Sequence, residues 1–136
     1  MRDRLTVGNA AVDSEEFRHW LVGDIESWTS SDTSPVELDR VGLRNTKDVE
    51  IKWGAHPAGE ARPGGWAPPS AKRVISILLR GRFVIRFRDP RDPGAPTEIC
   101  LSRLGDYVLW DEVLEHDWHA VDESLVLTVR WVPSAR

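Results

Sequence analysis

The stretch Gly105–Ala120, GDYVLWDEVLEHDWHA, decides how this chain is expected to fold. Residues 106–110 and 116–120 read as two short strands, and the leading glycine and the acidic residues 111–115 mark the turns beside them. Short strands punctuated by turn residues are typical of antiparallel sandwiches and barrels. The stretch therefore predicts an all-β protein.

Strand-like segments continue along the chain. Residues 73–79 are apolar on both faces, as expected of a central strand that is covered on both sides. Only residues 13–22, DSEEFRHWLV, show helical spacing, and their acidic first turn predicts one short helix that Gly23 ends. No glycine-rich phosphate-binding motif is present. The other expected strands are residues 48–53, 82–88, 97–101 and 124–132, with loops or turns at residues 56–70 and 89–96.

The length of 136 residues suits one domain. We expect residues 1–35 to form an N-terminal arm that contains the short helix, and residues 36–136 to form the β-barrel. The net charge of −4, with 15 arginines spread along the chain, argues against nucleic acid or an anionic membrane as the partner.

The cysteine content and the lack of long apolar runs restrict the class of protein further. Cys100 is the only cysteine, which excludes an intramolecular disulfide and a thiolate-rich zinc site, and we expect it in the core. No run is long enough for a signal peptide or a membrane span. We therefore expect a cytoplasmic protein.

Taken together, these segments resemble the cupin superfamily of small β-barrels, and more narrowly a subgroup of small single-domain actinobacterial cupins. The resemblance is strongest in the second cupin motif, where a histidine follows a glycine by eleven residues, as His116 follows Gly105. Gly81 matches the glycine that closes the first motif. The resemblance implies an antiparallel, cupin-like β-barrel (jelly roll) with a short N-terminal helix or arm.

The metal ligands of the first cupin motif are missing. Metal-binding cupins have a glutamate seven residues before the closing glycine, and Val74 stands there; the histidine region, residues 66–70, reads WAPPS. Only His116 of the four usual ligands remains, so we expect no metal cofactor. The alternative is a divalent metal such as Fe, Mn, Ni or Zn, held by His116, His56 and Glu60.

His116 is the candidate catalytic residue. An imidazole has an ordinary pKa of about 6.5, which suits general acid–base chemistry without a metal. His119 lies three residues further along the same strand and should face the opposite side, toward water. His19 reads as a surface residue of the helix.

Seven tryptophans are more than a small core needs, so we expect several to line a cavity for a flat, apolar or sugar-like ligand. Trp20 and Trp28 are expected to pack the arm onto the barrel or a second subunit. Arg73 is a candidate for binding a substrate carboxylate, as is Arg130. The candidate ligand-binding residues are Trp53, His56, Trp66, Arg73, Trp110, Trp118 and Trp131.

These observations favour a small-molecule-binding cupin that acts as a metal-independent isomerase, cyclase or lyase of specialised or sugar metabolism. One alternative is a metal-dependent oxygenase or isomerase, and another is a non-catalytic ligand-binding or sensing protein. A homodimer is expected, because residues 73–79 are apolar on both faces and the indoles outnumber the needs of one core.

Overall fold

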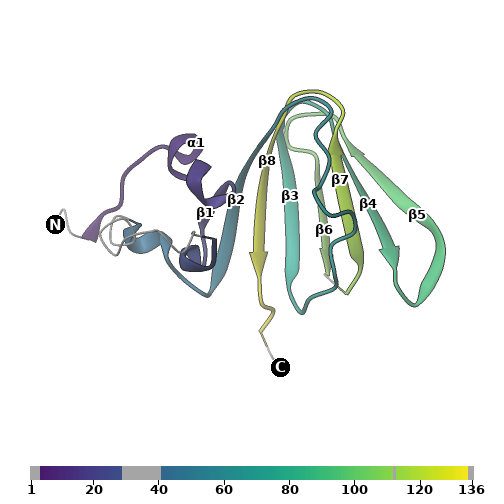
Figure 1. Cartoon of the computed structure of the whole chain (residues 1–136), viewed down its shortest axis with the longest axis horizontal. Coiled ribbons are helices and arrows are strands. Elements are labelled where there is room, and N and C mark those ends of the chain that lie inside the picture. Colours follow the sequence, from purple (N-terminus) through teal and green to yellow (C-terminus); the bar gives the residue numbers. More distant parts are fainter. Residues whose placement is uncertain (1–3, 29–40, 112, 135–136) are drawn as a thin grey trace.

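Two antiparallel β-sheets face each other in this computed structural model, which describes residues 4–28, 41–111 and 113–134 (Figure 1). Within these residues the larger sheet has the strand order β1-β2-β8-β3-β6 and the smaller sheet the order β5-β4-β7. The all-β prediction is confirmed. The strands are β1 (Trp20–Val22), β2 (Val49–His56), β3 (Arg73–Arg80), β4 (Phe83–Asp89), β5 (Asp92–Leu101), β6 (Tyr107–Asp111), β7 (Glu115–Ala120) and β8 (Ser124–Trp131).

The core lies between the two sheets. Strand β4 shows how it is built, because Phe83, Ile85 and Phe87 are buried there while Arg86 and Arg88 point outward, as the alternation predicts. Leu78 of β3 is fully buried and meets these rings from the larger sheet. The remaining buried members of this cluster are Val74, Leu101, Trp110, Ala120 and Val126.

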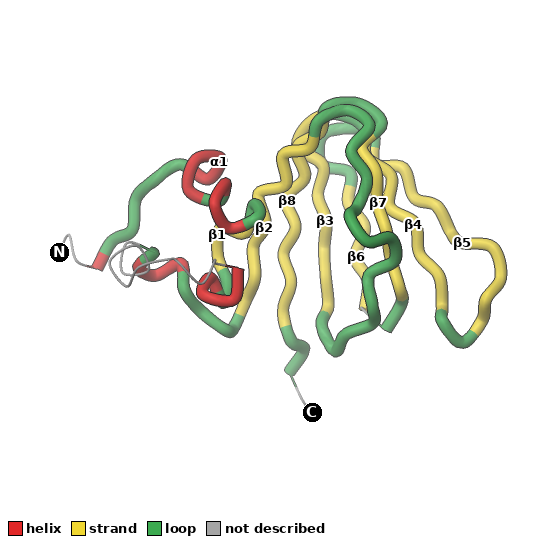
Figure 2. The backbone as a smooth tube through the Cα atoms, viewed as in Figure 1, coloured by secondary structure: helices red, strands yellow, loops and turns green. Residues whose placement is uncertain are grey.

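A long loop, residues 57–72, connects β2 to β3 and runs along the edge of β7, as Figure 2 shows. The amide of Arg62 donates to the carbonyl of Trp118 over 2.9 Å, and the amide of Ala67 donates to the carbonyl of His116 over 2.7 Å. The loop therefore behaves as an irregular fourth strand of the smaller sheet.

The prediction of a helix over residues 13–22 is wrong. The segment instead contains the end of α1 (Ala10–Asp13), the 3-10 turn η2 (Glu15–Phe17) and strand β1. Arg18 and His19 have φ angles of +54° and +72°, which end the helical conformation. The next residues pair with β2 instead, so pairing with a sheet edge overrides the local helical pattern.

In the structure the arm comprises residues 4–28 together with residues 41–48, and it packs beside β2 (Figure 1). It has a small core of its own, formed by Phe17, Trp20, Ile25 and Val41. Its other elements are the 3-10 turns η3 (Ile25–Trp28) and η4 (Gly42–Arg44). The expected boundary between residues 35 and 36 lies outside the described residues. No helix in the described ranges is long and apolar enough to span a membrane.

Two further expectations about the strands need correction. Strand β5 begins at Asp92 rather than at residue 97, because Asp89 accepts the amide of Arg91 and closes the turn earlier than the prolines indicate. Cys100 of this strand is exposed and not in the core. It lies beside Val84 on the side of the smaller sheet that faces away from the core, and an alternating strand alone does not reveal which side that is.

The outer face of the larger sheet is apolar. The register places Tyr107, Ile77, Leu127 and Trp53 in one row across four strands, and a parallel row joins Leu109, Ile75, Val129 and Ile51. Tyr107 and Leu109 are 63% and 55% exposed. The sequence predicts that residues 73–79 are covered on both sides, whereas the single chain buries only the inner face of this strand and leaves the outer, apolar face partly exposed.

Candidate functional site

A cavity of about 870 Å³ lies inside the barrel, between the two sheets. Its walls come from β2, β3, β6 and β8 of the larger sheet and from β4 and β7 of the smaller one. The loop of residues 57–72 contributes Glu60 and Arg62, and the arm contributes Arg18, His19, Trp20 and Trp28. A barrel interior that is accessible to solvent and mixes aromatic and charged groups is typical of a small-molecule site.

Strand β2 turns its polar side toward this cavity. Lys52, Gly54 and His56 line it, whereas Val49, Ile51 and Trp53 lie on the other face of the strand. The sequence pattern predicts that the apolar side of this strand is the buried one. That prediction is wrong because the outer face of this sheet is itself apolar, so hydrophobicity does not mark the interior here.

His56 forms a hydrogen-bonded pair with Glu60, whose carboxylate lies 2.6 Å from Nδ1. The carboxylate accepts, so Nδ1 carries the proton and Nε2 keeps its lone pair. The ring is 5% exposed and packs on Trp118, with ring centroids 4.4 Å apart. Burial lowers the pKa of His56, while the hydrogen bond to Glu60 opposes that shift. A neutral, oriented imidazole is suited to act as a general base.

Gly54 makes room for this imidazole. A Cβ atom at that position would lie 2.8 Å from Nε2 of His56 and 3.0 Å from the carbonyl oxygen of Val126. A larger residue would therefore displace the histidine from its place between strand and carboxylate.

His116 lies further along β7, with its ring 5.2 Å from that of Trp110 in an edge-on arrangement. Burial lowers the pKa of His116 to about 4, and the positive charges of Arg62 and Arg130 act in the same direction. Within the described ranges, Nδ1 of His116 and Nε1 of Trp110 are buried and have no hydrogen-bond partner. Buried ring nitrogens usually have partners, so this pair is a polar spot that a ligand can satisfy.

Among the described residues, the lysine and arginine side chains that line the cavity are Arg18, Lys52, Arg62 and Arg130. Arg130 is held by Glu50, whose two carboxylate oxygens lie 3.2 and 3.1 Å from Nη2. Lys72 pairs with the same carboxylate, and these cations lower the pKa of Glu50 against the effect of burial. Nη1 of Arg62 donates to the carbonyl of Gly65 over 2.7 Å. The wall thus carries positive charge on a chain that is negative overall.

Of His116 and the seven candidate ligand-binding residues, the structure brings four together, and Glu60 and Arg130, which the sequence also suggested, line the same cavity. His56, Trp110, His116 and Trp118 all line the cavity. Trp53, Trp66, Arg73 and Trp131 do not. Trp53 and Trp131 lie on the outward side of the larger sheet, so the side that each strand presents to the interior decides which indoles reach the cavity.

Trp66 and Arg73 are used elsewhere. The guanidinium groups of Arg88 and Arg86 lie 4.3 and 5.1 Å from the ring centroid of Trp66, over the outer face of the smaller sheet. Arg73 is exposed and pairs with Asp111 over 3.0 Å. Arg73 lies at the start of β3, in register with Asp111 of β6 and Trp131 of β8.

Sequence reasoning missed Lys52 and Arg62 as cavity residues and placed His19 on the surface. His19 lines the cavity, and its ring centroid lies 6.1 Å from that of His56. Burial lowers its pKa. The alternation in residues 48–53 contained the signal for Lys52, because it places Lys52 on the same face as His56.

Trp20 and Trp28 stack on each other, with centroids 5.2 Å apart, where the arm meets the cavity. His119 lies on the face of β7 opposite His116, as expected, and its neighbour across the edge is Ala61 of the loop.

The alternative metal ligands are only partly brought together. His56 and Glu60 are in contact. The residue of β7 that packs against His56 is Trp118, whereas the third expected ligand, His116, lies two residues before it on the same strand. Among residues 4–28, 41–111 and 113–134, no group of three or more His, Cys, Asp or Glu side chains has the geometry to hold a metal ion. A protein metal centre commonly uses three or four such ligands.

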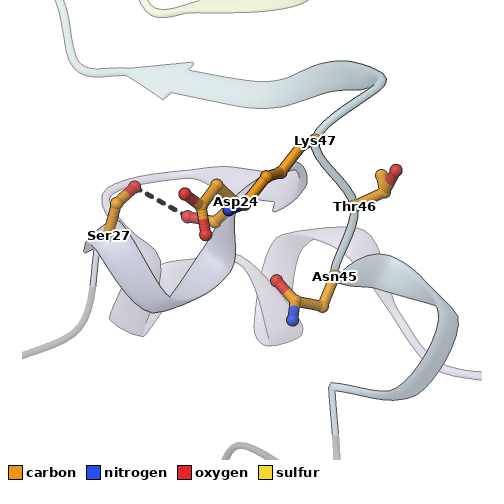
Figure 3. Close-up of a pocket in the computed structure, with 5 residues that line it drawn as sticks. All are labelled: Asp24, Ser27, Asn45, Thr46 and Lys47. Atoms are coloured by element: carbon orange, nitrogen blue, oxygen red, sulfur yellow. Dashed lines mark hydrogen bonds between the residues drawn. The ribbon is translucent and has the colours of Figure 1, made fainter.

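A second, more open pocket of about 460 Å³ lies in the arm (Figure 3). It is lined by Asp24, Ser27, Asn45, Thr46 and Lys47 and shares no residue with the barrel cavity. The hydroxyl of Ser27 donates to the backbone carbonyl of Asp24 over 2.7 Å. The residues that line this pocket are types commonly found in turns and helix caps, so we assign no catalytic role to it.

No protein-family model matches the chain, and no curated protein matches it. Solved structures do. A conserved protein of unknown function from Streptococcus pyogenes is 18% identical, with a TM-score of 0.54 over 68% of this chain and 72% of that one. KdgF from a Halomonas species is 17% identical, with a TM-score of 0.52 over 68% and 76%. The cupin domain of Cnp3 from Schizosaccharomyces pombe is 12% identical, with a TM-score of 0.50 over 63% and 57%.

These similarities establish the fold. The chain has an antiparallel jelly-roll fold similar to that of these structures, which include the Cnp3 cupin domain, as the resemblance based on the Gly105-to-His116 spacing implies. At this level of identity the similarity extends to the fold alone, and function has to be argued from the site.

Proposed function

We propose that this protein is a small-molecule-binding cupin whose barrel cavity takes an anionic organic ligand and transfers protons on it, as an isomerase or lyase does. One observation supports this most directly: the aromatic cavity carries the cations Lys52, Arg62 and Arg130 beside the His56–Glu60 pair. The cations would bind a carboxylate or phosphate, and the indole rings would cover the apolar part of the ligand.

The acid–base chemistry would be divided between two imidazoles. Nε2 of His56 would remove a proton from a carbon next to the anionic group, and Glu60 would stabilise the imidazolium that forms. His116, the catalytic residue expected from the sequence, is neutral at pH 7. It would form a hydrogen bond with the far end of the ligand, or transfer a proton there, beside Nε1 of Trp110. The neighbouring cations would stabilise the developing negative charge.

The test uses pairs of compounds that differ in charge. D-Glucuronate and benzoate are compared with D-glucose and benzyl alcohol by quenching of tryptophan fluorescence, which reports on the cavity indoles. We expect each acid to bind at least about tenfold more tightly than its neutral partner, which corresponds to about 1.4 kcal/mol. Equal affinities, or no quenching by any acid, would contradict the proposal.

Two variants sharpen this comparison. Lys52→Met should weaken binding of the acids by about tenfold and leave the neutral compounds unchanged, because one cation is lost. Lys47→Met is the matched control, since Lys47 is exposed and lies in the arm. D-Glucuronate carries a hydrogen on C5, next to its carboxylate, and benzoate has none there, so exchange of the C5 hydrogen of glucuronate with deuterated water, followed by NMR, tests proton transfer. The exchange should disappear in His56→Gln, whereas retained exchange would remove His56 from the mechanism.

Two alternative functions, a metal-dependent enzyme and a non-catalytic sensor, would use the same cavity residues differently. A metal-dependent enzyme is favoured by the contact between His56 and Glu60, which are both potential ligands. Elemental analysis of purified protein decides this question, because a stoichiometric metal that His56→Ala loses would establish it. A non-catalytic sensor would bind the acids but show no hydrogen exchange.

We also infer that the chain forms the homodimer expected from its sequence, through the apolar outer face of the larger sheet. A face with Tyr107 and Leu109 more than half exposed is suited to bury itself against a second copy. Leu109→Arg should shift the protein toward the monomer in light scattering, because the dissociation constant of the dimer should rise at least about tenfold. Leu43→Arg, a similarly exposed leucine of the arm, should not. A monomeric wild-type protein would refute the inference.

A further inference from the structure

Lys52 is a cavity cation that lies against two aromatic rings. Its ammonium nitrogen is 5.5 Å from the ring centroid of Trp118 and 5.8 Å from that of Trp20. In the described part of the chain, no salt bridge includes Lys52, whereas Lys72 pairs with Glu50. The ring faces favour the ammonium modestly, but a buried ammonium that has no carboxylate partner among the described residues loses hydration that these contacts do not replace, which disfavours its charged form.

The environment of this amine makes it a nucleophile near neutral pH. Burial lowers the pKa of Lys52 to about 8, and Arg130 and Arg62 act in the same direction, while Glu60 opposes them. At pH 7 about a tenth of such an amine is uncharged, against roughly 0.04% for a lysine at the ordinary pKa of about 10.4. The uncharged amine is the form that attacks a carbonyl carbon.

The groups that such a reaction needs lie around the same indole. Trp118 contacts both Lys52 and His56, so the amine and the His56–Glu60 pair flank one ring. Lys52 also shares a ring with Arg130, because the ring centroid of Trp20 is 5.8 Å from Nζ of Lys52 and 5.0 Å from the guanidinium carbon of Arg130. A ligand carbonyl at Lys52 would therefore have proton-transfer groups on one side and a guanidinium on the other.

We propose that Lys52 forms an imine with an aldehyde or ketone that also carries a carboxylate. The proposal rests on the anion binding proposed above and specifies the substrate as an oxo acid. The amine nitrogen attacks the carbonyl carbon and forms a C–N bond, and a proton passes from nitrogen to oxygen. The second amine proton then leaves with that oxygen as water, and a C=N bond remains. No oxidant or reductant takes part.

Reductive trapping tests this directly, because the chain has only three lysines: Lys47, Lys52 and Lys72. The protein is treated near pH 7 with glyoxylate and cyanoborohydride, which reduces an imine to a stable carboxymethyl-lysine, and peptides are mapped by mass spectrometry. We expect Lys52 to be modified at least about tenfold faster than Lys47 or Lys72, given its larger fraction of uncharged amine. A Lys52 that reacts no faster than the other two would overturn the proposal.

Matched variants separate imine formation from simple anion binding. Lys52→Arg keeps the positive charge, so acids should still quench the fluorescence while the trapped product disappears. Lys47→Arg should change neither result. Acetaldehyde lacks the carboxylate, so its preference for Lys52 should be smaller. Arg130→Met should slow capture of glyoxylate more than capture of acetaldehyde, because loss of this cation raises the pKa of Lys52 for both aldehydes but removes an anion-binding group only for glyoxylate. Acids that bind without any trapping at Lys52 would refute the imine and leave anion binding standing; failure of both assays would refute both proposals.

Discussion

Replacing Gly81 with alanine is expected to lower the free energy of unfolding by about 3 kcal/mol or more, and the melting temperature by roughly 10 °C. Gly81 forms the turn between β3 and β4 at a φ of +97°, a conformation that residues with a Cβ rarely adopt. A Cβ there would lie 2.2 Å from the carbonyl oxygen of Glu123 and 2.7 Å from Cα of Ser124. These are backbone atoms of the β7–β8 connection and of the first residue of β8, so they cannot move aside as a flexible side chain can.

Urea unfolding followed by circular dichroism measures the effect, and two other glycines serve as controls. Gly105 has a φ of +91°, but no atom lies within 4 Å of the point that a Cβ would occupy, so Gly105→Ala should lose only about 1 kcal/mol from backbone strain. Gly94 has no positive φ and its nearest contact is 3.7 Å, so Gly94→Ala should be close to neutral. If Gly81→Ala and Gly105→Ala lose the same free energy, the overlap with Glu123 is not what fixes this turn.

Lowering the pH from about 7 to about 4 should destabilise the protein, with roughly 2 to 3 kcal/mol of the loss traceable to His116. Its pKa is about 4 in the folded chain, against 6.5 ordinarily. Between these values the unfolded chain binds more protons than the folded one, so the free energy of unfolding rises with pH across this window. The stabilisation from a neutral His116 is therefore present above pH 6.5 and lost as the pH falls toward 4.

The comparison with a variant isolates this contribution, because burial also lowers the pKa values of His19 and His56. His116→Gln should show a flatter dependence of unfolding free energy on pH than the wild-type protein. His119→Gln, on the outer face of the same strand, should keep the wild-type slope. Parallel curves for wild type and His116→Gln would mean that His116 is not held neutral by its surroundings.

The fold could be predicted because its signals are local. Alternation in residues 82–88 places Phe83, Ile85 and Phe87 on one face, and the glycines at 81 and 105 mark turns that few other residues can form. The helix prediction for residues 13–22 is wrong because the conformation there is decided by the free edge of β2, which a local pattern does not contain.

The site was predictable where the interior face was recognised correctly. The spacing that identifies His116 also places Trp118 on its face, and both line the cavity. The same reasoning fails for strand β2, because the inner side of this strand faces a polar cavity rather than a packed core. The roles of Lys52 and Glu60 depend on the fold, which places them beside His56 and Trp118.

The loop of residues 57–72 has a consequence for solubility. A sheet edge with unpaired amides can recruit a strand from another molecule, and β7 would have such an edge. Ala61 and Ala67 pair with His119 and His116 there, so the loop occupies the positions that a foreign strand would need. At the opposite edge, β5 carries Pro96, which has no amide to donate. Both borders of the smaller sheet are thereby protected against the edge-to-edge stacking that leads to fibrils.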